Sequence, residues 1–178
     1  MYKLKFSKLQ HEIFRLLCIR AGNALSQRDI ARLIGVSPTA VGKAVKILEK
    51  ERAVEVKSST LKVRLVGLNR DNPKAMEMKR VENLSTIYSS GLIDTLEEKF
   101  PGTAIVLFGS YSRGDDTASS DIDIAIIGSK QKNIELSKFN KMLERLVVLQ
   151  FYPSLREIGK ELRENICNGI VLAGGLEL

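Results

Sequence analysis

The fold of the C-terminal half is decided by residues 103–127, TAIVLFGSYSRGDDTASSDIDIAII. One apolar run in this stretch ends at Gly109-Ser110, and a second begins, ten residues further on, with Asp121-Ile122-Asp123. Both runs are short and border on turn-forming residues, which predicts two buried strands joined by a polar loop. Because side chains two residues apart on a strand point to the same face, we expect Asp121 and Asp123 to project together.

The paired acids predict a cation site. Two neighbouring carboxylates repel each other unless a cation lies between them, and hard oxygen ligands suit Mg²⁺ or Mn²⁺, which in turn hold the phosphates of a nucleotide. Gly109 permits a tight turn with close backbone approach, and Ser110 starts a short helix able to hold a phosphate. Taken alone, Asp-x-Asp favours a pair of solvated acids at a strand edge. Its combination with Gly109-Ser110 favours the nucleotide site.

The two motifs together resemble the signature of the DNA polymerase β nucleotidyltransferase superfamily: Gly109-Ser110-Tyr111-Ser112-Arg113-Gly114 and Ser120-Asp121-Ile122-Asp123-Ile124. The resemblance is closest to the minimal nucleotidyltransferases and covers about residues 95–178. It implies that Asp121 and Asp123 are catalytic metal ligands and that ATP or another nucleoside triphosphate is the substrate. It also implies a set of nucleotide-binding residues, namely Gly109, Ser110, Arg113 and Ser120.

The implied reaction transfers a nucleoside monophosphate, AMP in the case of ATP, to a hydroxyl acceptor on a partner protein. The ten-residue spacing between the motifs resembles the antitoxin-type members of toxin–antitoxin pairs, which modify a toxin of the HEPN ribonuclease class. The resemblance therefore implies a HEPN-type partner as a candidate acceptor.

Downstream of Asp123, the pattern predicts a crossover helix over residues 130–144, a third strand over 146–150 and a final helix over 154–168. Strands that alternate with helices indicate an α/β domain with a small mixed sheet. Residues 169–174 add a short apolar segment at the end of the chain.

One position departs from the family pattern. Active members carry a third carboxylate on the strand after the crossover, where it completes a two-metal site. The matching position here is nearest Val148, in an apolar run without an acid, and neither Glu144 nor Glu135 has the right register. The missing acid favours a competing hypothesis, a DNA-binding transcriptional regulator whose degenerate nucleotidyltransferase domain only binds or senses a nucleotide. A partner-docking scaffold is a third hypothesis.

Charge is distributed unevenly along the 178 residues. Residues 1–70 carry 15 Lys and Arg against 5 Asp and Glu, a net charge of +10, whereas residues 71–178 carry 13 against 16, a net charge of −3. The two halves sum to the net charge of +7 of the whole chain. This asymmetry indicates a nucleic-acid-binding module attached to a second domain, although basic residues that merely solubilise a small domain are an alternative. Cys18 and Cys167 are expected to be free thiols. No stretch is typical of a membrane span or signal peptide, so we expect a cytoplasmic protein with no membrane partner.

The N-terminal half resembles a winged helix-turn-helix domain. Apolar periodicity predicts a helix over residues 6–20, Ser26 caps a second helix, and Ser37-Pro38 begins a third. Residues 53–57 and 61–66 predict the two strands of a wing. The expected fold class is therefore α+β or α/β, with a winged helix-turn-helix DNA-binding domain at 1–70, a helical linker at 71–94 and a mixed-sheet nucleotidyltransferase domain at 95–178.

The third helix and the wing predict an interface for double-stranded DNA. In a major groove, the first residues of the helix would lie near base edges, while its lysines and the basic residues of the wing would contact phosphates. The predicted contact residues are Ser37, Thr39, Lys43, Lys46, Lys50, Lys57, Lys62 and Arg64. Each lysine alone is better explained as a solvated charge, but the set on this pattern favours nucleic acid. Winged helices also serve as dimerisation or docking modules, which leaves a homodimer open.

Overall fold

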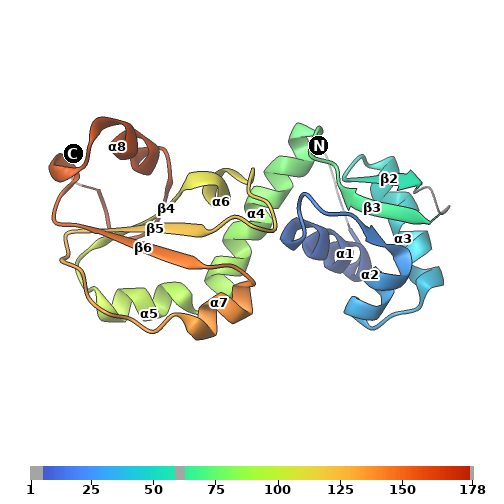
Figure 1. Cartoon of the computed structure of the whole chain (residues 1–178), viewed down its shortest axis with the longest axis horizontal. Helices are drawn as coiled ribbons and strands as arrows, with labels where there is room; N and C mark the ends of the chain where they lie inside the picture. Colours follow the sequence, from blue (N-terminus) through green and yellow to red (C-terminus); the bar gives the residue numbers. More distant parts are fainter. Residues whose placement is uncertain (1–5, 59–62, 177–178) are drawn as a thin grey trace. The chain divides into compact units, whose positions relative to one another are not determined.

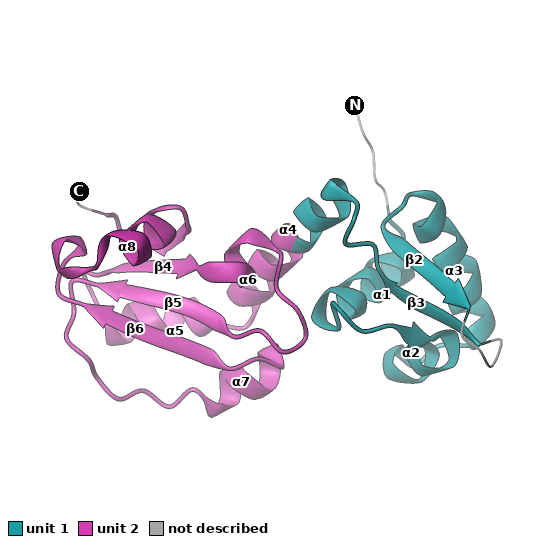
Figure 2. Ribbon diagram, turned by 45° about the horizontal axis from the view of Figure 1, so that its top comes forward, with its two compact units in different colours: residues 1–79 teal, residues 80–178 magenta. Residues whose placement is uncertain are grey.

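The computed structural model describes residues 6–58 and 63–176, which form two compact units, unit 1 at residues 1–79 and unit 2 at residues 80–178 (Figure 2). The division falls within helix α4 (Pro73–Ser89), inside the segment predicted as a helical linker. The first half of α4 contributes Met76 and Met78 to the core of unit 1, and its second half contributes Leu84 and Ile87 to the core of unit 2. In the described ranges, no helix has the length and apolarity that crossing a membrane requires.

Unit 1 is a winged helix-turn-helix. Its elements are α1 (Lys8–Ile19), β1 (Leu25–Ser26), α2 (Gln27–Ile34), α3 (Pro38–Lys50), β2 (Val54–Ser58) and β3 (Arg64–Leu68), with the strands in the antiparallel order β1-β3-β2. Serine side chains cap the starts of α1, α2 and α3. The caps at Ser26 and Ser37 and the proline at the start of α3 are those that the sequence predicts. Gly35 ends α2 at φ +77°, a conformation that lets the chain turn sharply into α3.

The core of unit 1 lies between the three helices and the small sheet. Ile13, Leu17, Ile30, Val45 and Leu48 are almost fully buried in it. The second strand of the wing ends at Leu68, two residues beyond its predicted end, because Leu68 pairs with Val54, while Val66 pairs with both Leu25 and Val56. This pairing buries Val66 and Leu68, and residues 61 and 62 lie outside the described residues.

Unit 2 is built on a four-stranded mixed sheet, as expected. Its strands are β4 (Ala104–Phe108), β5 (Ile122–Ile127), β6 (Val147–Tyr152) and β7 (Ile170–Ala173), in the order β6-β5-β4-β7. The β5–β6 pair is parallel and the other two pairs are antiparallel. In the β4–β5 pair, Phe108 lies opposite Asp123, so the end of β4 and the start of β5 meet at one edge of the unit.

Helices cover both faces of this sheet (Figure 1). Helices α5 (Leu92–Lys99) and α7 (Ser137–Leu143) pack on the face that carries Ile122, Ile124 and Ile126. Helix α8 (Lys160–Cys167) packs on the opposite face, which carries Ala125 and Ile127. By strand alternation, Asp123 belongs to the α8 face.

Two predicted helices are shorter in the structure. The crossover helix predicted over 130–144 forms only as α7, with Leu136 at its N-cap position; the Glu135 side chain accepts a hydrogen bond from the backbone N–H of Ser137, the first residue of the helix (2.8 Å). The predicted helix over 154–168 divides into a 3₁₀ turn (Leu155–Glu157) and α8, with Gly159 between them. Strand β6 extends two residues beyond its predicted end, to Tyr152.

Candidate functional site

The residues of the first motif follow β4 directly and form the five-residue helix α6 (Gly109–Arg113). Gly109 adopts φ +73°, and a Cβ atom built on it would lie 2.7 Å from Oδ2 of Asp123. A side chain at this position would therefore collide with the carboxylate, and the backbone conformation also favours glycine. The structure thus brings the two motifs together, with the backbone of Gly109 against the carboxylate of Asp123.

The second motif provides the charge of the site. Asp121 is exposed immediately before β5, and Asp123 is half-buried on the strand. Burial raises the pKa of the Asp123 carboxyl above its usual value, and the negative charge of Asp121 raises that pKa further. Both effects disfavour the ionised form, and a cation between the two carboxylates would oppose them. The pair therefore fits a hard divalent ion with oxygen ligands.

The protein alone provides few ligands for such an ion. Within residues 6–58 and 63–176, no group of three or more His, Cys, Asp or Glu side chains is placed to hold a metal. An ion at Asp121 and Asp123 would therefore need oxygen ligands from elsewhere, and the phosphates of a nucleotide are of the right chemical type.

Helix α6 places Ser110 directly after Gly109, the residue whose backbone lies against Asp123. The buried hydroxyl of Ser112 donates a hydrogen bond to the Gly109 carbonyl (2.8 Å), and Gly114 ends the helix at φ +82°. These features fix the turn in which Ser110, partly buried, follows directly after Gly109.

The other two predicted nucleotide-binding residues make contacts within the protein. The exposed guanidinium of Arg113 donates from Nε to Asp115 Oδ2 (3.2 Å) and from Nη1 to Asn165 Oδ1 on α8 (3.3 Å). The hydroxyl oxygen of Ser120 accepts a hydrogen bond from the Thr117 backbone N–H (2.9 Å) and shapes the turn before Asp121. Their roles in nucleotide binding stay predictions.

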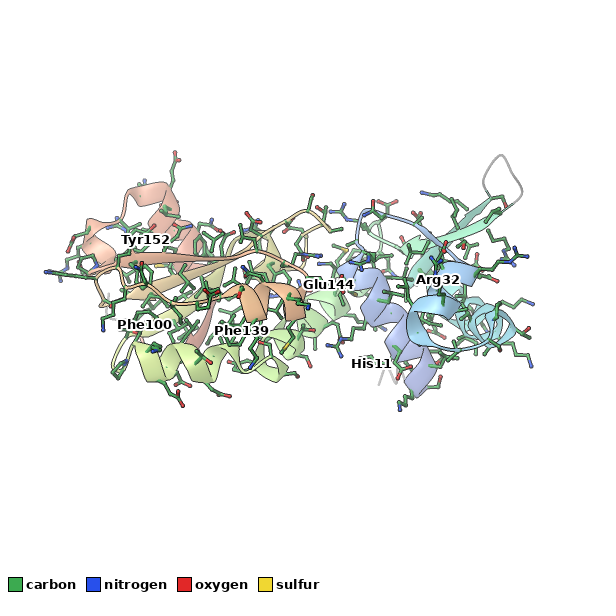
Figure 3. All side chains as sticks on the ribbon, turned by 60° about the horizontal axis from the view of Figure 1, so that its bottom comes forward. His11, Arg32, Phe100, Phe139, Glu144 and Tyr152 are labelled. Carbon is green, nitrogen blue, oxygen red and sulfur yellow. The ribbon has the colours of Figure 1, made fainter. Side chains whose placement is uncertain are left out.

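Strand register places Val148, the residue predicted to stand at the position of the third acid, beside Asp123. Val148 of β6 is the direct partner of Asp123 in the parallel β5–β6 pair, so their side chains share one face of the sheet. The two acids considered as alternatives lie elsewhere. Glu144 is exposed at the end of α7, with φ +50° (Figure 3), and Glu135 accepts a hydrogen bond from the backbone N–H of Ser137 at the start of the same helix.

Several residues that hold the site together were not predicted from the sequence. On α4, Arg80 Nε donates to the Ser112 carbonyl (2.8 Å), and Asn83 Nδ2 donates to the Tyr111 carbonyl (2.9 Å). The Asn83 amide also donates to Asp116 Oδ1 (2.7 Å). The partners are 28 to 33 residues apart in the chain, so no local spacing could reveal them.

In unit 1, helix α3 presents four of the eight predicted DNA-contacting residues on one exposed side. Thr39, Lys43, Lys46 and Lys50 recur at helical spacing and are all exposed. Ser37 is also exposed, and its hydroxyl oxygen accepts a hydrogen bond from the Ala40 backbone N–H (3.2 Å) as the helix cap. The hydroxyl hydrogen of Ser37 remains able to donate to another group.

The basic residues of the wing form ion pairs within unit 1. Lys57 Nζ lies 2.8 Å from Glu55 Oε1, and the hydrogen bond and charge of Glu55 raise the pKa of Lys57. Arg64 Nη2 lies 3.8 Å from Glu49 Oε2. Between the wing and the starts of α2 and α3 there is a hollow of about 340 Å³, lined by Ser26, Gln27, Arg28, Pro38, Val63 and Arg64. Lys62 lies outside the described residues.

Comparison with known proteins identifies the type of domain that carries the two motifs. Residues 89–170 match the family model of the nucleotidyltransferase domain. This stretch, just under half of the chain, contains helices α5 to α8, strands β4 to β6 and both acids. Unit 2 therefore contains a nucleotidyltransferase-like domain.

Two proteins of Methanocaldococcus jannaschii, both provisionally named protein adenylyltransferases, are similar to part of the chain. One is 42% identical over 53 residues, which cover 29% of this chain and 53% of the relative. The other is 37% identical over 51 residues, which cover 29% of this chain and 51% of the relative. The chain thus spans about half the length of the curated relatives it matches.

Among solved structures, similarity is found to bacterial regulators at low sequence identity. ZitR of Lactococcus lactis, a zinc-responsive MarR family member, is 23% identical with a TM-score of 0.43, and the alignment covers 56% of this chain and 66% of ZitR. The adhesin competence repressor AdcR of Streptococcus pyogenes is 22% identical with a TM-score of 0.44, covering 56% of this chain and 70% of AdcR.

Proposed function

We propose that unit 2 is a Mg²⁺- or Mn²⁺-dependent nucleotidyltransferase that transfers a nucleoside monophosphate, AMP from ATP, to a hydroxyl acceptor. The observation that carries the proposal is the contact between the backbone of Gly109 and the carboxylate of Asp123, where a Cβ would lie 2.7 Å from Oδ2. The raised pKa of Asp123 beside Asp121 supports a cation at this place. The match to the nucleotidyltransferase domain and the names of the two archaeal relatives support the type of reaction.

In this proposal Asp121 and Asp123 hold the metal ion, which when bound neutralises the charge of the triphosphate and helps to orient it. The backbone of Gly109 and the N–H and hydroxyl of Ser110 approach the β- and γ-phosphates. Arg113 exchanges its contacts with Asp115 and Asn165 for the departing pyrophosphate, whose charge it offsets. Ser120 stabilises the turn that precedes Asp121, because its hydroxyl oxygen accepts the hydrogen bond from the Thr117 backbone N–H.

The transfer itself is an in-line displacement. The acceptor hydroxyl oxygen bonds to the α-phosphorus, the bond from that phosphorus to the bridging oxygen of the β-phosphate breaks, and pyrophosphate leaves. The hydroxyl proton passes to solvent, because β6 provides Val148 where a carboxylate would otherwise stand. We expect transfer to be slow unless the acceptor assists, and our candidate acceptor is a HEPN-type partner protein.

We also propose that unit 1 binds double-stranded DNA, with α3 in the major groove. The support is the exposed row of Thr39, Lys43, Lys46 and Lys50 on the second helix of a helix-turn-helix. The wing would contribute flanking phosphate contacts through Arg64 and Lys57, each of which would exchange a solvent-exposed ion pair for a phosphate.

A second candidate function is a DNA-binding regulator whose unit 2 binds a nucleotide without transferring it. One observation favours it, the apolar side chain of Val148 beside Asp123. In this case Asp121 and Asp123 would hold the same ion and nucleotide, and occupancy would report the nucleotide concentration to the DNA-binding unit.

Incubation of the purified chain with ATP labelled at the α-phosphate separates these candidates. The reaction is run with Mg²⁺ or with EDTA, with and without the product of the neighbouring gene, and Asp123→Asn serves as the matched control. Label that appears on protein only with Mg²⁺ and wild-type chain supports the transferase. Bound but untransferred nucleotide favours the sensor, and no Mg²⁺-dependent binding of any nucleoside triphosphate refutes both.

A further inference from the structure

A buried polar cluster in unit 2 has no role in the proposed chemistry. Asp116, Arg145 and Asn83 are only 1%, 6% and 5% exposed. Arg145 Nη2 lies 3.7 Å from Asp116 Oδ2, and Asn83 Nδ2 donates to Asp116 Oδ1 at 2.7 Å. Charged groups are costly to bury even as a pair, and a pair of well-packed apolar side chains often gives a protein of equal stability. Stability alone is therefore a weak reason for this arrangement.

The cluster joins the two motifs of the nucleotide site. Asp116 lies in the loop that leads from α6 to Asp121. The Asn83 amide contacts this loop through Asp116 and also holds the Tyr111 carbonyl in α6 (2.9 Å). One helix, α4, thus holds both α6 and the loop that follows it.

The other end of the loop is held from the β6 side. Arg145 stands in the turn that leads into β6, and Nη1 of its guanidinium donates to the Glu144 carbonyl (2.9 Å). The next residue, Leu146, accepts a hydrogen bond at its carbonyl from the Ile122 backbone N–H (2.8 Å), between the two site aspartates. The ion pair between Asp116 and Arg145 therefore links the loop to the turn before β6, whose Leu146 carbonyl accepts the hydrogen bond from the Asp-x-Asp motif.

We propose that Asp116, together with Asn83 and Arg145, is a positioning group that sets the distance between α6 and the two metal-binding aspartates. This inference rests on the proposed function of unit 2. Asp116 is too deeply buried to touch a nucleotide, so it acts through the loop backbone. Groups that orient metal ligands in this indirect way change metal affinity and activity by about 10- to 100-fold when they are replaced.

The test compares Asp116→Asn with a control that loses a buried hydrogen bond elsewhere in unit 2. Thr103→Val is suitable, because the Thr103 hydroxyl donates to the Phe100 carbonyl (2.7 Å) at the opposite end of β4 from Gly109. Arg145→Lys keeps the positive charge but loses the planar fork of the guanidinium, so it tests the geometry of the pair. For each full-length variant, calorimetry measures the Kd for Mg²⁺–ATP, urea unfolding measures stability, and hydrogen exchange measures protection of the amides of residues 114–121.

We expect Asp116→Asn to weaken Mg²⁺–ATP binding by about tenfold or more, Arg145→Lys to weaken it less, and Thr103→Val to bind like wild type even where it unfolds more easily. A folded Asp116→Asn that binds Mg²⁺–ATP like wild type overturns the inference. If Asp116→Asn fails to fold, Arg145→Lys decides, and wild-type affinity in that variant overturns it equally.

Failure of the proposed function gives a different result. If wild type binds no Mg²⁺–ATP, the nucleotide site itself is refuted, and hydrogen exchange still reports on the cluster. Faster exchange at residues 114–121 in Asp116→Asn than in Thr103→Val supports the hold of the cluster on the loop. Equal exchange in the two variants refutes the role of the cluster in holding the loop.

Discussion

The substitution Gly109→Ala tests the contact on which the site depends. An alanine at φ +73° is strained by about 1–2 kcal/mol, because its Cβ crowds the following carbonyl in a left-handed conformation. The same Cβ would lie 2.7 Å from Asp123 Oδ2, where ordinary contact begins at 3.4 Å, so the carboxylate must move by about 0.7 Å. Metal–ligand distances tolerate only about 0.2 Å. We therefore expect a variant that is folded and that binds Mg²⁺–ATP at least about tenfold more weakly.

Gly102→Ala is the matched control. Gly102 has nearly the same backbone conformation, φ +76°, but nothing lies within 4 Å of the added Cβ. Both variants should lose about 1–2 kcal/mol of unfolding free energy in urea, and only Gly109→Ala should lose affinity in calorimetry. Equal Mg²⁺–ATP affinities in the two variants would refute the assignment of Asp123 as a metal ligand.

Three further predictions concern the missing acid, the DNA interface and pH. Val148→Asp should raise the rate of nucleotidyl transfer by about 10²-fold, and Asp123 should stay essential in that variant. If Val148→Asp unfolds while wild type transfers nucleotide rapidly, the third metal ligand lies elsewhere. For binding to duplex DNA, Lys43→Ala and Lys46→Ala should each reduce the slope of log affinity against log salt concentration by about one, whereas Lys8→Ala on α1 should leave the slope unchanged. An unchanged slope in all three variants contradicts the proposed interface. Because the pKa of Asp123 is raised in the folded state, the protonated carboxyl stabilises the fold below about pH 4, and this contribution is lost as pH rises through the folded-state pKa. At neutral pH, metal-free Asp123→Asn should therefore unfold at a higher urea midpoint than wild type. An equal or lower midpoint contradicts this prediction.

Local signals in the sequence were sufficient for the helices of unit 1 and the strands of the site. Ser26 and Ser37 cap the helices that they were expected to begin, because a cap depends on a residue and its next few neighbours. The two apolar runs around the motifs form β4 and β5, and Val148 stands beside Asp123 as its position after the crossover predicts. In each case the deciding interactions are near in sequence or follow from strand alternation.

Long-range contacts account for what the sequence did not reveal. The end of the second wing strand at Leu68 depends on the pairing of Leu68 with Val54, and this pairing cannot be derived from the alternation of residues 61–66 alone. Helix α7 begins only at Ser137, whose backbone N–H donates to the Glu135 side chain, and the apolar pattern of residues 130–144 does not reveal this start. The pair of Asp116 and Arg145 joins residues of opposite charge that look like surface residues in the sequence, and only the fold buries them together.

The most direct test of the central claim is titration calorimetry of a non-hydrolysable ATP analogue into the full-length chain, with Mg²⁺ and with EDTA. Binding to wild type should require Mg²⁺ and should be abolished in Asp121→Asn and in Asp123→Asn, while both variants keep the circular dichroism spectrum of wild type. Binding of equal strength in wild type and both variants, or binding unaffected by EDTA, would contradict the central claim.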